Sequence, residues 1–259
     1  VGYGGRVGQL DKIIEICKEY NLKLILDAAH MAGTRVNGQM PGIWDGVDVA
    51  VYSFQAVKNL PTADSGMICF HNKKYDEICR KLTWLGINKD TYARNSGTKG
   101  SYKWKYDVEY LGYKDHGNSI MAAIGLAQLE RYPGLLERRR EIIDRYNDVF
   151  KDCPVSVVPH YTDEHMSSGH LYLVRINDAT AEQRNELIER MAEKGVATNV
   201  HYKPIPMHTA YKKLGFSIDD YPNAYDQFKN EITLPLHTNL SDEEVSYVIH
   251  TFKECLGAL

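Results

Sequence analysis

The sequence predicts an α/β fold, and three observations support this prediction. Short apolar runs typical of buried strands alternate with segments of helical spacing through the first third of the chain. Helix-length connections separate these runs, which favours a layer built largely on parallel pairing. After residue 154 the pattern becomes strand, helix, strand, loop and helix, which is typical of a compact α+β domain. We therefore expect two domains, residues 1–134 and 135–259.

Composition argues against several classes of function. The 259 residues carry 31 basic and 34 acidic side chains, and a net charge of −3 argues against nucleic acid or an anionic membrane surface as main partner. No apolar run reaches the about 18 residues of a membrane-spanning helix. The histidines and cysteines are dispersed without metal-ligand spacing, so we expect no metal site and the reduced thiols of a cytoplasmic protein. The cysteines are Cys17, Cys69, Cys79, Cys153 and Cys255.

One helix and three strands are expected before residue 71. Helical spacing runs from Leu10 to Tyr20, with Asp11 where an acidic group favours a helix N-terminus. Apolar runs predict strands over residues 22–27, 47–54 and 66–70.

A nearly apolar segment from Ser119 predicts a buried helix. Pro133 is expected to break that helix, because proline is not tolerated in a helix interior. The basic run 138–140 lies between carboxylates and within helical apolar spacing, so it favours a solvated helix face over a nucleic-acid contact.

The second part of the chain is expected to open with a strand over residues 171–176 and to contain another over 196–200. Thr180 and Ser241 each begin a capping box, in which the hydroxyl and a side chain three residues later satisfy the amides of a helix end.

Three polar side chains follow the ends of the predicted strands. Asp27 closes the first strand, Ser53 lies at the end of the second, and Lys58 follows five residues later. In an open α/β sheet, ligands bind beyond the carboxyl ends of the strands, so these groups can converge. A lysine amine, a carboxylate for a ring nitrogen and a phosphate donor together suit pyridoxal phosphate. The alternative interpretation is that Lys58 is a surface lysine, Asp27 a helix cap and Ser53 a turn residue, and that the three share no site.

The sequence around these residues resembles the nucleotide-sugar aminotransferases of the DegT/StrS group, within the fold-type I, aspartate-aminotransferase-like superfamily. The likeness spans essentially the whole chain. The motifs that carry it are, in chain order, Asp27-Ala28-Ala29-His30, Ser53-Phe54 with Lys58-Asn59, Gly66, Leu111-Gly112-Tyr113, Gly125-Leu126 with Gln128-Leu129, His170-Leu171-Tyr172, Gly195-Val196, Val200-His201-Tyr202 with Pro204, and Leu234-Pro235-Leu236. The resemblance implies a three-layer αβα large domain, incomplete here at its N-terminus, and a smaller C-terminal α+β domain.

The resemblance also implies roles for individual residues. Lys58 is expected to form the Schiff base with pyridoxal phosphate and to shuttle protons, and Asp27 to pair with the pyridinium nitrogen. His30 is expected to contact the cofactor ring, and Ser53 to hold the phosphate. Relatives that are dehydratases carry His at the lysine position, so Lys58 favours transamination from glutamate to a nucleotide-linked keto-deoxysugar. Family active sites use two subunits, so a homodimer is expected.

Two segments depart from the family pattern. In the loop that a partner subunit lends to the phosphate, either Lys114 or Asn118 could supply the contact, and we include Asn118 among the cofactor-binding residues. Downstream, Pro206 stands where several members place a second histidine. His201 and His208 therefore either line the sugar site or are structural.

The beginning of the chain is a further departure. Family members carry a long segment before the position of Val1, and the chain opens without an initiator Met, so we expect it to begin partway through a longer protein. Three explanations stay open, namely a shortened protein, a natural split with a separate N-terminal chain, and a degenerate remnant. The alternative function is accordingly a non-catalytic fragment or subunit that needs the missing part in trans. A Rossmann-type dehydrogenase is disfavoured, because residues 2–8 are glycine-rich without the dinucleotide-binding spacing.

Overall fold

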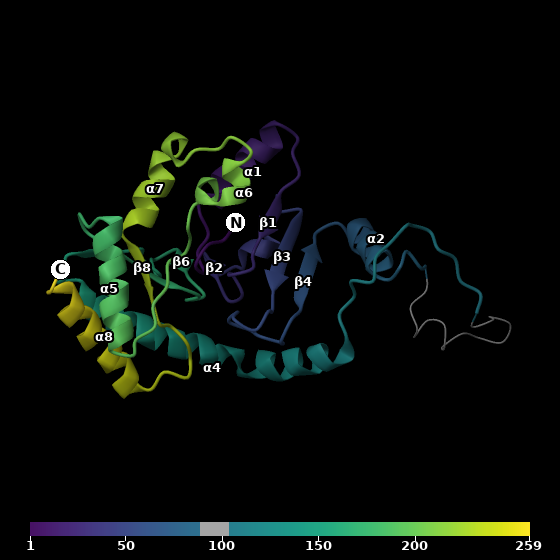
Figure 1. Ribbon diagram of the computed structural model, residues 1–259. Coiled ribbons are helices and arrows are strands. Elements are labelled where there is room, and N and C mark those ends of the chain that lie inside the picture. The colour runs from purple at the N-terminus through teal and green to yellow at the C-terminus, as the bar shows by residue number, and fades with distance from the viewer. Residues whose placement is uncertain (89–103) are drawn as a thin grey trace. The chain divides into compact units, whose positions relative to one another are not determined.

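The computed structural model describes residues 1–88 and 104–259, which form two compact units (Figure 1). Unit 1 comprises Val1–Gly2, Val7–Ala32 and Gln39–Arg131. Unit 2 comprises Tyr3–Arg6, Gly33–Gly38 and Tyr132–Leu259. Each unit has its own buried hydrophobic core.

Unit 1 contains a three-stranded sheet in the order β1-β3-β4. The strand β1 (Ile25–Asp27) pairs in parallel with β3 (Val49–Ser53), as the sequence predicts. The strand β4 (Gly66–Phe70) is antiparallel to β3, so the prediction of largely parallel pairing is wrong for this strand. The physical reason is the connection, because residues 54–65 form only turns and bends and contain no helix that could carry the chain back across the sheet as a parallel crossover does.

The first helix of unit 1 follows the predicted spacing. The helix α1 (Leu10–Glu19) buries Leu10 and Ile14 against β1 and β3 side chains. The helix α2 (Lys73–Thr83) is capped by Asn72, whose Oδ1 accepts a hydrogen bond of 2.9 Å from the Lys74 backbone N–H. A short 3₁₀ turn, η1 (Pro41–Ile43), precedes β3.

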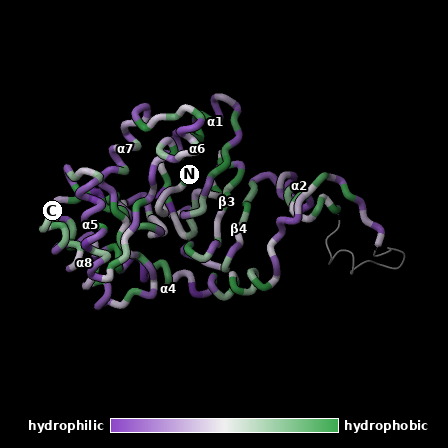
Figure 2. The backbone as a smooth tube through the Cα atoms, in the orientation of Figure 1, coloured by the Kyte–Doolittle hydropathy of each residue, from purple (hydrophilic) through white to green (hydrophobic). Residues whose placement is uncertain are grey.

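The long helix α4 (Ser119–Phe150) runs through Pro133, so the expected break at this proline is wrong. A proline inside a helix costs about 3 kcal/mol, through its missing N–H and its clash with the preceding turn. Three side chains on the following turns, Ile142, Tyr146 and Phe150, are almost fully buried, and each contributes about 1.5–3 kcal/mol. Their burial outweighs the cost of the proline. Figure 2 shows that the first turns of α4 are mainly hydrophobic, but none of residues 119–131 is buried, so the prediction of a buried helix is wrong for this segment.

Unit 2 is built on an antiparallel sheet in the order β5-β7-β8, with a second, two-stranded sheet of β2 and β6. Its core contains the aromatic side chains Tyr146, Phe150, Tyr172 and Phe252. The strands are β2 (Arg35–Val36), β5 (Val155–Val157), β6 (His165–Met166), β7 (Tyr172–Ile176) and β8 (Glu231–Leu234). The helices are α5 (Ala181–Glu193), α6 (Thr209–Lys212), α7 (Pro222–Lys229) and α8 (Asp242–Leu256), with 3₁₀ turns η2 (Ile205–Met207) and η3 (Ile218–Asp220).

Both predicted capping boxes are confirmed. The Thr180 hydroxyl caps α5 and the Ser241 hydroxyl caps α8, each with the reciprocal side-chain bond in place. The strand predicted over residues 196–200 is wrong, because only Asn199 pairs with Thr233, through backbone hydrogen bonds of 2.7 and 3.2 Å. The next amide that could continue a strand, that of His201, donates instead to the Glu231 carboxylate.

Candidate active site

Asp27 and Ser53 lie at the same edge of the unit 1 sheet. In the parallel pair, Asp27 is opposite Val51, so Ser53 lies two residues beyond it. The Asp27 Oδ1 accepts a hydrogen bond of 3.0 Å from the Ala29 backbone N–H, which holds the carboxylate over the first residues after β1. The Ser53 Oγ accepts a longer one, of 3.4 Å, from the Gln55 N–H. Parallel pairing therefore brings these two predicted residues to one edge.

Lys58 lies in the loop between β3 and β4, and backbone hydrogen bonds hold this loop in shape. The Phe54 N–H donates to Ser65 at 2.7 Å, and the Thr62 N–H donates to Phe54 at 2.8 Å. The Lys58 N–H donates to the Gln55 carbonyl at 2.9 Å, which closes a turn just before the lysine. The loop therefore begins and ends at the edge of the unit 1 sheet where Ser53 ends β3.

The Lys58 side chain is half-buried and electrostatically coupled to Asp27. Burial lowers the pKa of the Lys58 amine, because desolvation disfavours the charged form, and the Asp27 carboxylate partly opposes this by raising it. The Asp27 carboxylate therefore acts electrostatically on the Lys58 amine, as expected for two groups near the same edge of the sheet. His30 is half-buried and follows β1 by three residues.

Asn118 lies at the wall of a cavity of about 570 Å³ in unit 1. Phe54, Thr62 and Gly66 line the same cavity, whereas Asp27, His30, Ser53 and Lys58 are not among its lining residues. The Asn118 Oδ1 accepts a hydrogen bond of 2.9 Å from the Met121 N–H at the start of α4. The amide oxygen is therefore a helix cap, and its NH₂ group is the donor that a ligand could use.

The alternative phosphate contact, Lys114, has another role in the described chain. Its ammonium lies 3.3 Å from the centroid of the Trp84 ring, a cation–π geometry, and 3.4 Å from His116 Nε2. This position favours Asn118 over Lys114 as the donor. His201 lies in unit 2, where its ring Nδ1 is 2.8 Å from the Thr233 hydroxyl.

Two residues shape the lysine loop, although no role was assigned to them from the sequence. Thr62 is buried, and its hydroxyl bonds to Phe54 O at 3.3 Å and to the Ser65 hydroxyl. Gly66 faces the Tyr52 carbonyl so closely that an added Cβ would approach that oxygen at 2.7 Å. The run Thr62-Ala63-Asp64-Ser65-Gly66, rich in turn-forming residues before a strand, was the available signal.

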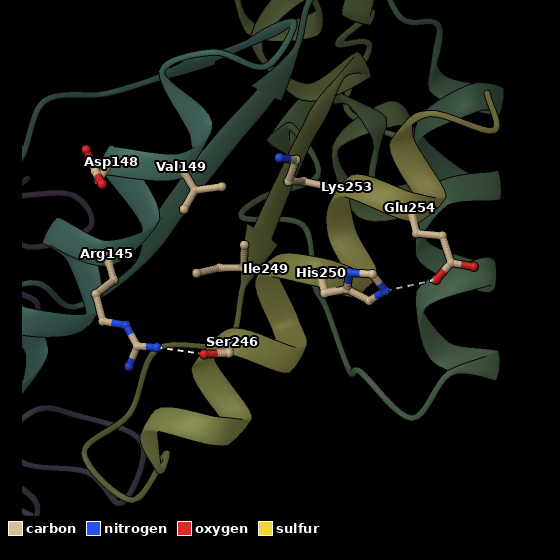
Figure 3. A pocket seen from close by; sticks show the side chains of 8 residues that line it. All are labelled: Arg145, Asp148, Val149, Ser246, Ile249, His250, Lys253 and Glu254. Atoms are coloured by element: carbon tan, nitrogen blue, oxygen red, sulfur yellow. Dashed lines mark hydrogen bonds and ion pairs between the residues drawn. The ribbon is translucent and has the colours of Figure 1, made fainter.

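A groove of about 740 Å³ in unit 2 has a different character (Figure 3). Val149 and Ile249 form its apolar part, and charged side chains of α4 and α8 surround them. Arg145 donates to the Ser246 hydroxyl at 2.8 Å, and His250 Nε2 lies 4.0 Å from Glu254. These are contacts of solvent-exposed helix faces and indicate no catalytic chemistry. In the described part of the chain, no helix is long and apolar enough to cross a membrane.

Comparison with known proteins gives consistent matches. The sequence model of the DegT/DnrJ/EryC1/StrS aminotransferase family matches residues 1–253. The spore coat polysaccharide biosynthesis protein SpsC of Bacillus subtilis is 32% identical over 98% of this chain and 65% of its own length. The dTDP-4-dehydro-2,3,6-trideoxy-D-glucose 4-aminotransferase of Saccharopolyspora spinosa is 32% identical over 98% of this chain and 64% of its own length. The chain thus spans just under two thirds of the length of these relatives.

Solved structures agree with the sequence comparison. The PMP form of Spr1654 from Streptococcus pneumoniae superimposes with a TM-score of 0.89 at 39% identity, over 99% of this chain and 68% of that one. The likeness confirms the predicted α/β fold class.

Proposed function

Because the chain belongs to the DegT/DnrJ/EryC1/StrS aminotransferase family, we propose that the protein catalyses a pyridoxal-phosphate-dependent transamination. In this reaction glutamate donates an amino group to a keto group on a nucleotide-linked deoxysugar, in surface polysaccharide or deoxysugar biosynthesis. The names of SpsC and of the Saccharopolyspora spinosa enzyme support the substrate class, and the PLP and PMP forms of Spr1654 support the cofactor.

The placement of Asp27 and Ser53 at one edge of the β1–β3 pair, with the half-buried Lys58 in the loop that follows, is the observation that carries this proposal. The donor set fits the cofactor, because an amine, a carboxylate and a hydroxyl are the groups that its aldehyde, ring nitrogen and phosphate require. Under this proposal Lys58 holds the cofactor, Asp27 its ring nitrogen, His30 its ring, and Ser53 and Asn118 its phosphate. The cofactor site then belongs to a large domain, residues 1–134, and residues 135–259 form the small domain.

When bound, pyridoxal phosphate supplies an electron-withdrawing ring that stabilises the charge left as a proton leaves the substrate Cα. Asp27 keeps a proton on the ring nitrogen, since a carboxylate favours the protonated, cationic form of its neighbour. Lys58 accepts the Cα proton and returns it, and its lowered pKa makes more of the neutral amine available for this step.

We further propose a cytoplasmic homodimer. The early turns of α4 support the dimer, because Ile120 is 76% exposed and Leu126 is 67% exposed. A second subunit would remove these side chains from water. The dispersed free cysteines support a reducing compartment. Sedimentation that finds only monomers would contradict the dimer.

The test of the cofactor assignment is chemical trapping. The protein is mixed with pyridoxal phosphate, reduced with borohydride, digested and analysed by mass spectrometry. We expect the cofactor mass on the peptide that contains Lys58, loss of labelling and of transamination in Lys58→Ala, and no change in the control Lys74→Ala, an exposed lysine of α2. Attachment at other lysines alone would refute the assignment. Labelling of Lys58 only after a separate N-terminal chain is added would support the non-catalytic subunit instead.

The role of Asp27 is tested by Asp27→Asn. We expect kcat/KM to fall by an amount worth on the order of 3 kcal/mol, the size of loss seen when a key electrostatic partner is removed. Independently of turnover, the pKa of Lys58 should fall further in this variant, because the carboxylate that raises it is gone. The pH dependence of Lys58 labelling by an amine-reactive reagent measures that shift. An unchanged Lys58 profile would mean that the two groups are not coupled.

A further inference from the structure

A cavity of about 480 Å³ lies in unit 2, and none of its lining residues belongs to the proposed cofactor site. Its wall comes from the last turns of α4, from β5 and from the residues that follow β5. Phe150, Val155 and Val157 make much of this wall apolar. The volume lies within the range of small-molecule sites, in which a few polar groups on an apolar wall orient the ligand. The polar groups of the wall therefore decide which ligand fits.

His160 is the most deeply buried polar residue of this wall, with 3% of its surface exposed. Its ring stacks on that of Tyr172, with the centroids 5.6 Å apart and the planes 8° from parallel. Its Nδ1 lies 3.1 Å from the Ser167 hydroxyl. The other ring nitrogen, Nε2, has no hydrogen-bond partner within the described residues, and it is not one of the fully enclosed polar atoms. Nε2 is therefore the ring atom that a ligand in the cavity can reach.

The Ser167 hydroxyl determines which nitrogen of His160 carries the proton. Ser167 Oγ accepts a hydrogen bond of 3.0 Å from the Gly169 N–H, and its own proton has no acceptor other than His160 Nδ1 in the part of the chain that the structure describes. A buried hydroxyl proton needs an acceptor, so Nδ1 accepts and the ring proton lies on Nε2. Burial, together with the Arg6 guanidinium, lowers the pKa of His160 to about 4, so the ring is neutral at pH 7. Nε2 thus presents a neutral donor.

Asn147 supplies a second donor to the same cavity. The Tyr172 hydroxyl donates to Asn147 Oδ1 at 2.9 Å, which fixes the orientation of the amide. The amide NH₂ group then has no hydrogen-bond partner among the described residues. Tyr172 is fully buried, and it holds both donors, His160 through its ring and Asn147 through its hydroxyl. The two donors therefore belong to one rigid arrangement.

The charged groups of the wall each have a partner of opposite sign. Asp144 lies 3.9 Å from Arg140, and Lys151 lies 2.6 Å from Asp148. Burial raises the pKa of Asp144, which shows that part of its hydration is already lost, and an anion placed beside it would be repelled. Two neutral donors on an apolar wall instead suit an acceptor oxygen without charge.

We propose that this cavity binds an uncharged small molecule with a carbonyl oxygen on an apolar body the size of one aromatic ring, and that this oxygen accepts hydrogen bonds from His160 Nε2 and from the Asn147 NH₂ group. Tyr172 and Ser167 are positioning residues for these donors. The inference uses no residue of the proposed cofactor site, and its test needs no pyridoxal phosphate.

The tautomer is measured by nitrogen-15 NMR of the histidine rings of the whole chain at pH 7, with His160→Gln used to assign the resonances. We expect the proton of His160 on Nε2. A wild-type ring with its proton on Nδ1 would overturn the proposal, because Nε2 could then donate nothing to a carbonyl oxygen.

Binding is measured by titrating acetophenone while the resonances of the His160 ring and of the Asn147 side-chain amide are followed. Ethylbenzene, in which a CH₂ group replaces the carbonyl, is the matched control, and benzoate tests the effect of charge. We expect a saturable shift of both donors with acetophenone, and affinities at least about fivefold weaker for the other two probes. No shift with acetophenone, equal affinity for ethylbenzene, or tighter binding of benzoate would overturn the proposal.

Two variants with the same chemical change separate binding from structure. Asn147→Asp keeps the oxygen that accepts from Tyr172 and removes the NH₂ donor, so acetophenone should bind at least about fivefold more weakly, with ethylbenzene unaffected. Asn177→Asp is the control, since Asn177 also accepts from a hydroxyl, that of Ser156, but does not line the cavity. It should bind acetophenone as the wild type does. Equal acetophenone affinity in the two variants would overturn the role of the Asn147 donor.

Discussion

In two strands of the molecule, β4 in unit 1 and β8 in unit 2, burial is the opposite of what the residue types predict. β4 reads Gly-Met-Ile-Cys-Phe, an almost wholly apolar run, yet none of its residues is buried. β8 reads Glu-Ile-Thr-Leu and carries a carboxylate and a hydroxyl, yet all four of its residues are buried. Residue type alone therefore does not determine burial; the elements packed around a strand do.

The polar residues of β8 can be buried because each has a partner. Glu231 accepts from His201 and Thr233, and Arg184 donates to the Glu231 carbonyl at 2.9 Å. Burial of an unpaired carboxylate would instead cost several kcal/mol. In β4 no such network is needed, because its side chains reach water. The comparison teaches that burial in this protein is supported by hydrogen-bond partners as much as by hydrophobicity.

The largest expected effect comes from Ile232→Ala in β8. Ile232 is fully buried in the unit 2 core, and removing three methyl or methylene groups there should lower the free energy of unfolding by about 4 kcal/mol. Hydrogen exchange of the β7 and β8 amides, followed by mass spectrometry, measures the loss. A cost below about 1 kcal/mol would show that this strand is not part of a packed core.

An intermediate effect is expected from the ionisation of Glu231. Its pKa is raised from 4.5 to about 6 in the folded protein, so the folded state binds this proton more tightly than the unfolded state does. The contribution of Glu231 to the free energy of unfolding is fully present below about pH 4.5 and is lost as the pH rises through 6. The total loss is about 2 kcal/mol.

The measurement compares wild type with Glu231→Gln, which cannot titrate, by urea unfolding between pH 4.5 and 7. The comparison with Glu231→Gln is needed because His160 also makes stability depend on pH. Burial lowers the pKa of His160 to about 4, so its contribution to the free energy of unfolding rises with pH where that of Glu231 falls. We expect the wild type to lose stability relative to Glu231→Gln as pH rises. Parallel curves would mean that the Glu231 pKa is not raised.

The smallest effect is expected from Ile68→Ala in β4, the counterpart of the β8 variant. Ile68 is 44% exposed, so the cost should stay below about 1 kcal/mol. Tryptophan fluorescence reports this unit, because Trp44, Trp84 and Trp104 all belong to unit 1. A cost equal to that of Ile232→Ala would remove the contrast between the strands.

Several features were readable from the sequence because their causes are local. The helix spacing after Leu10, the capping boxes at Thr180 and Ser241, and the strand at residues 66–70 all depend on neighbours within a few residues. The direction of β4 and the path of α4 through Pro133 were mispredicted, because each depends on groups brought together only by folding. The roles of Asp27, His30, Ser53, Lys58 and Asn118 stay predictions.

By itself the sequence determined the order of chemical groups along the chain, a carboxylate, a hydroxyl and a lysine after successive strands. It determined the family as well, because that order and its surrounding motifs are fixed along the backbone. Only the tertiary structure decided which distant groups interact. The coupling of Lys58 to Asp27, and the hold of Glu231 and Thr233 on His201, depend on desolvation and on hydrogen bonds across strands. Both act over a few ångströms in space, so they cannot be inferred from the spacing of residues along the sequence.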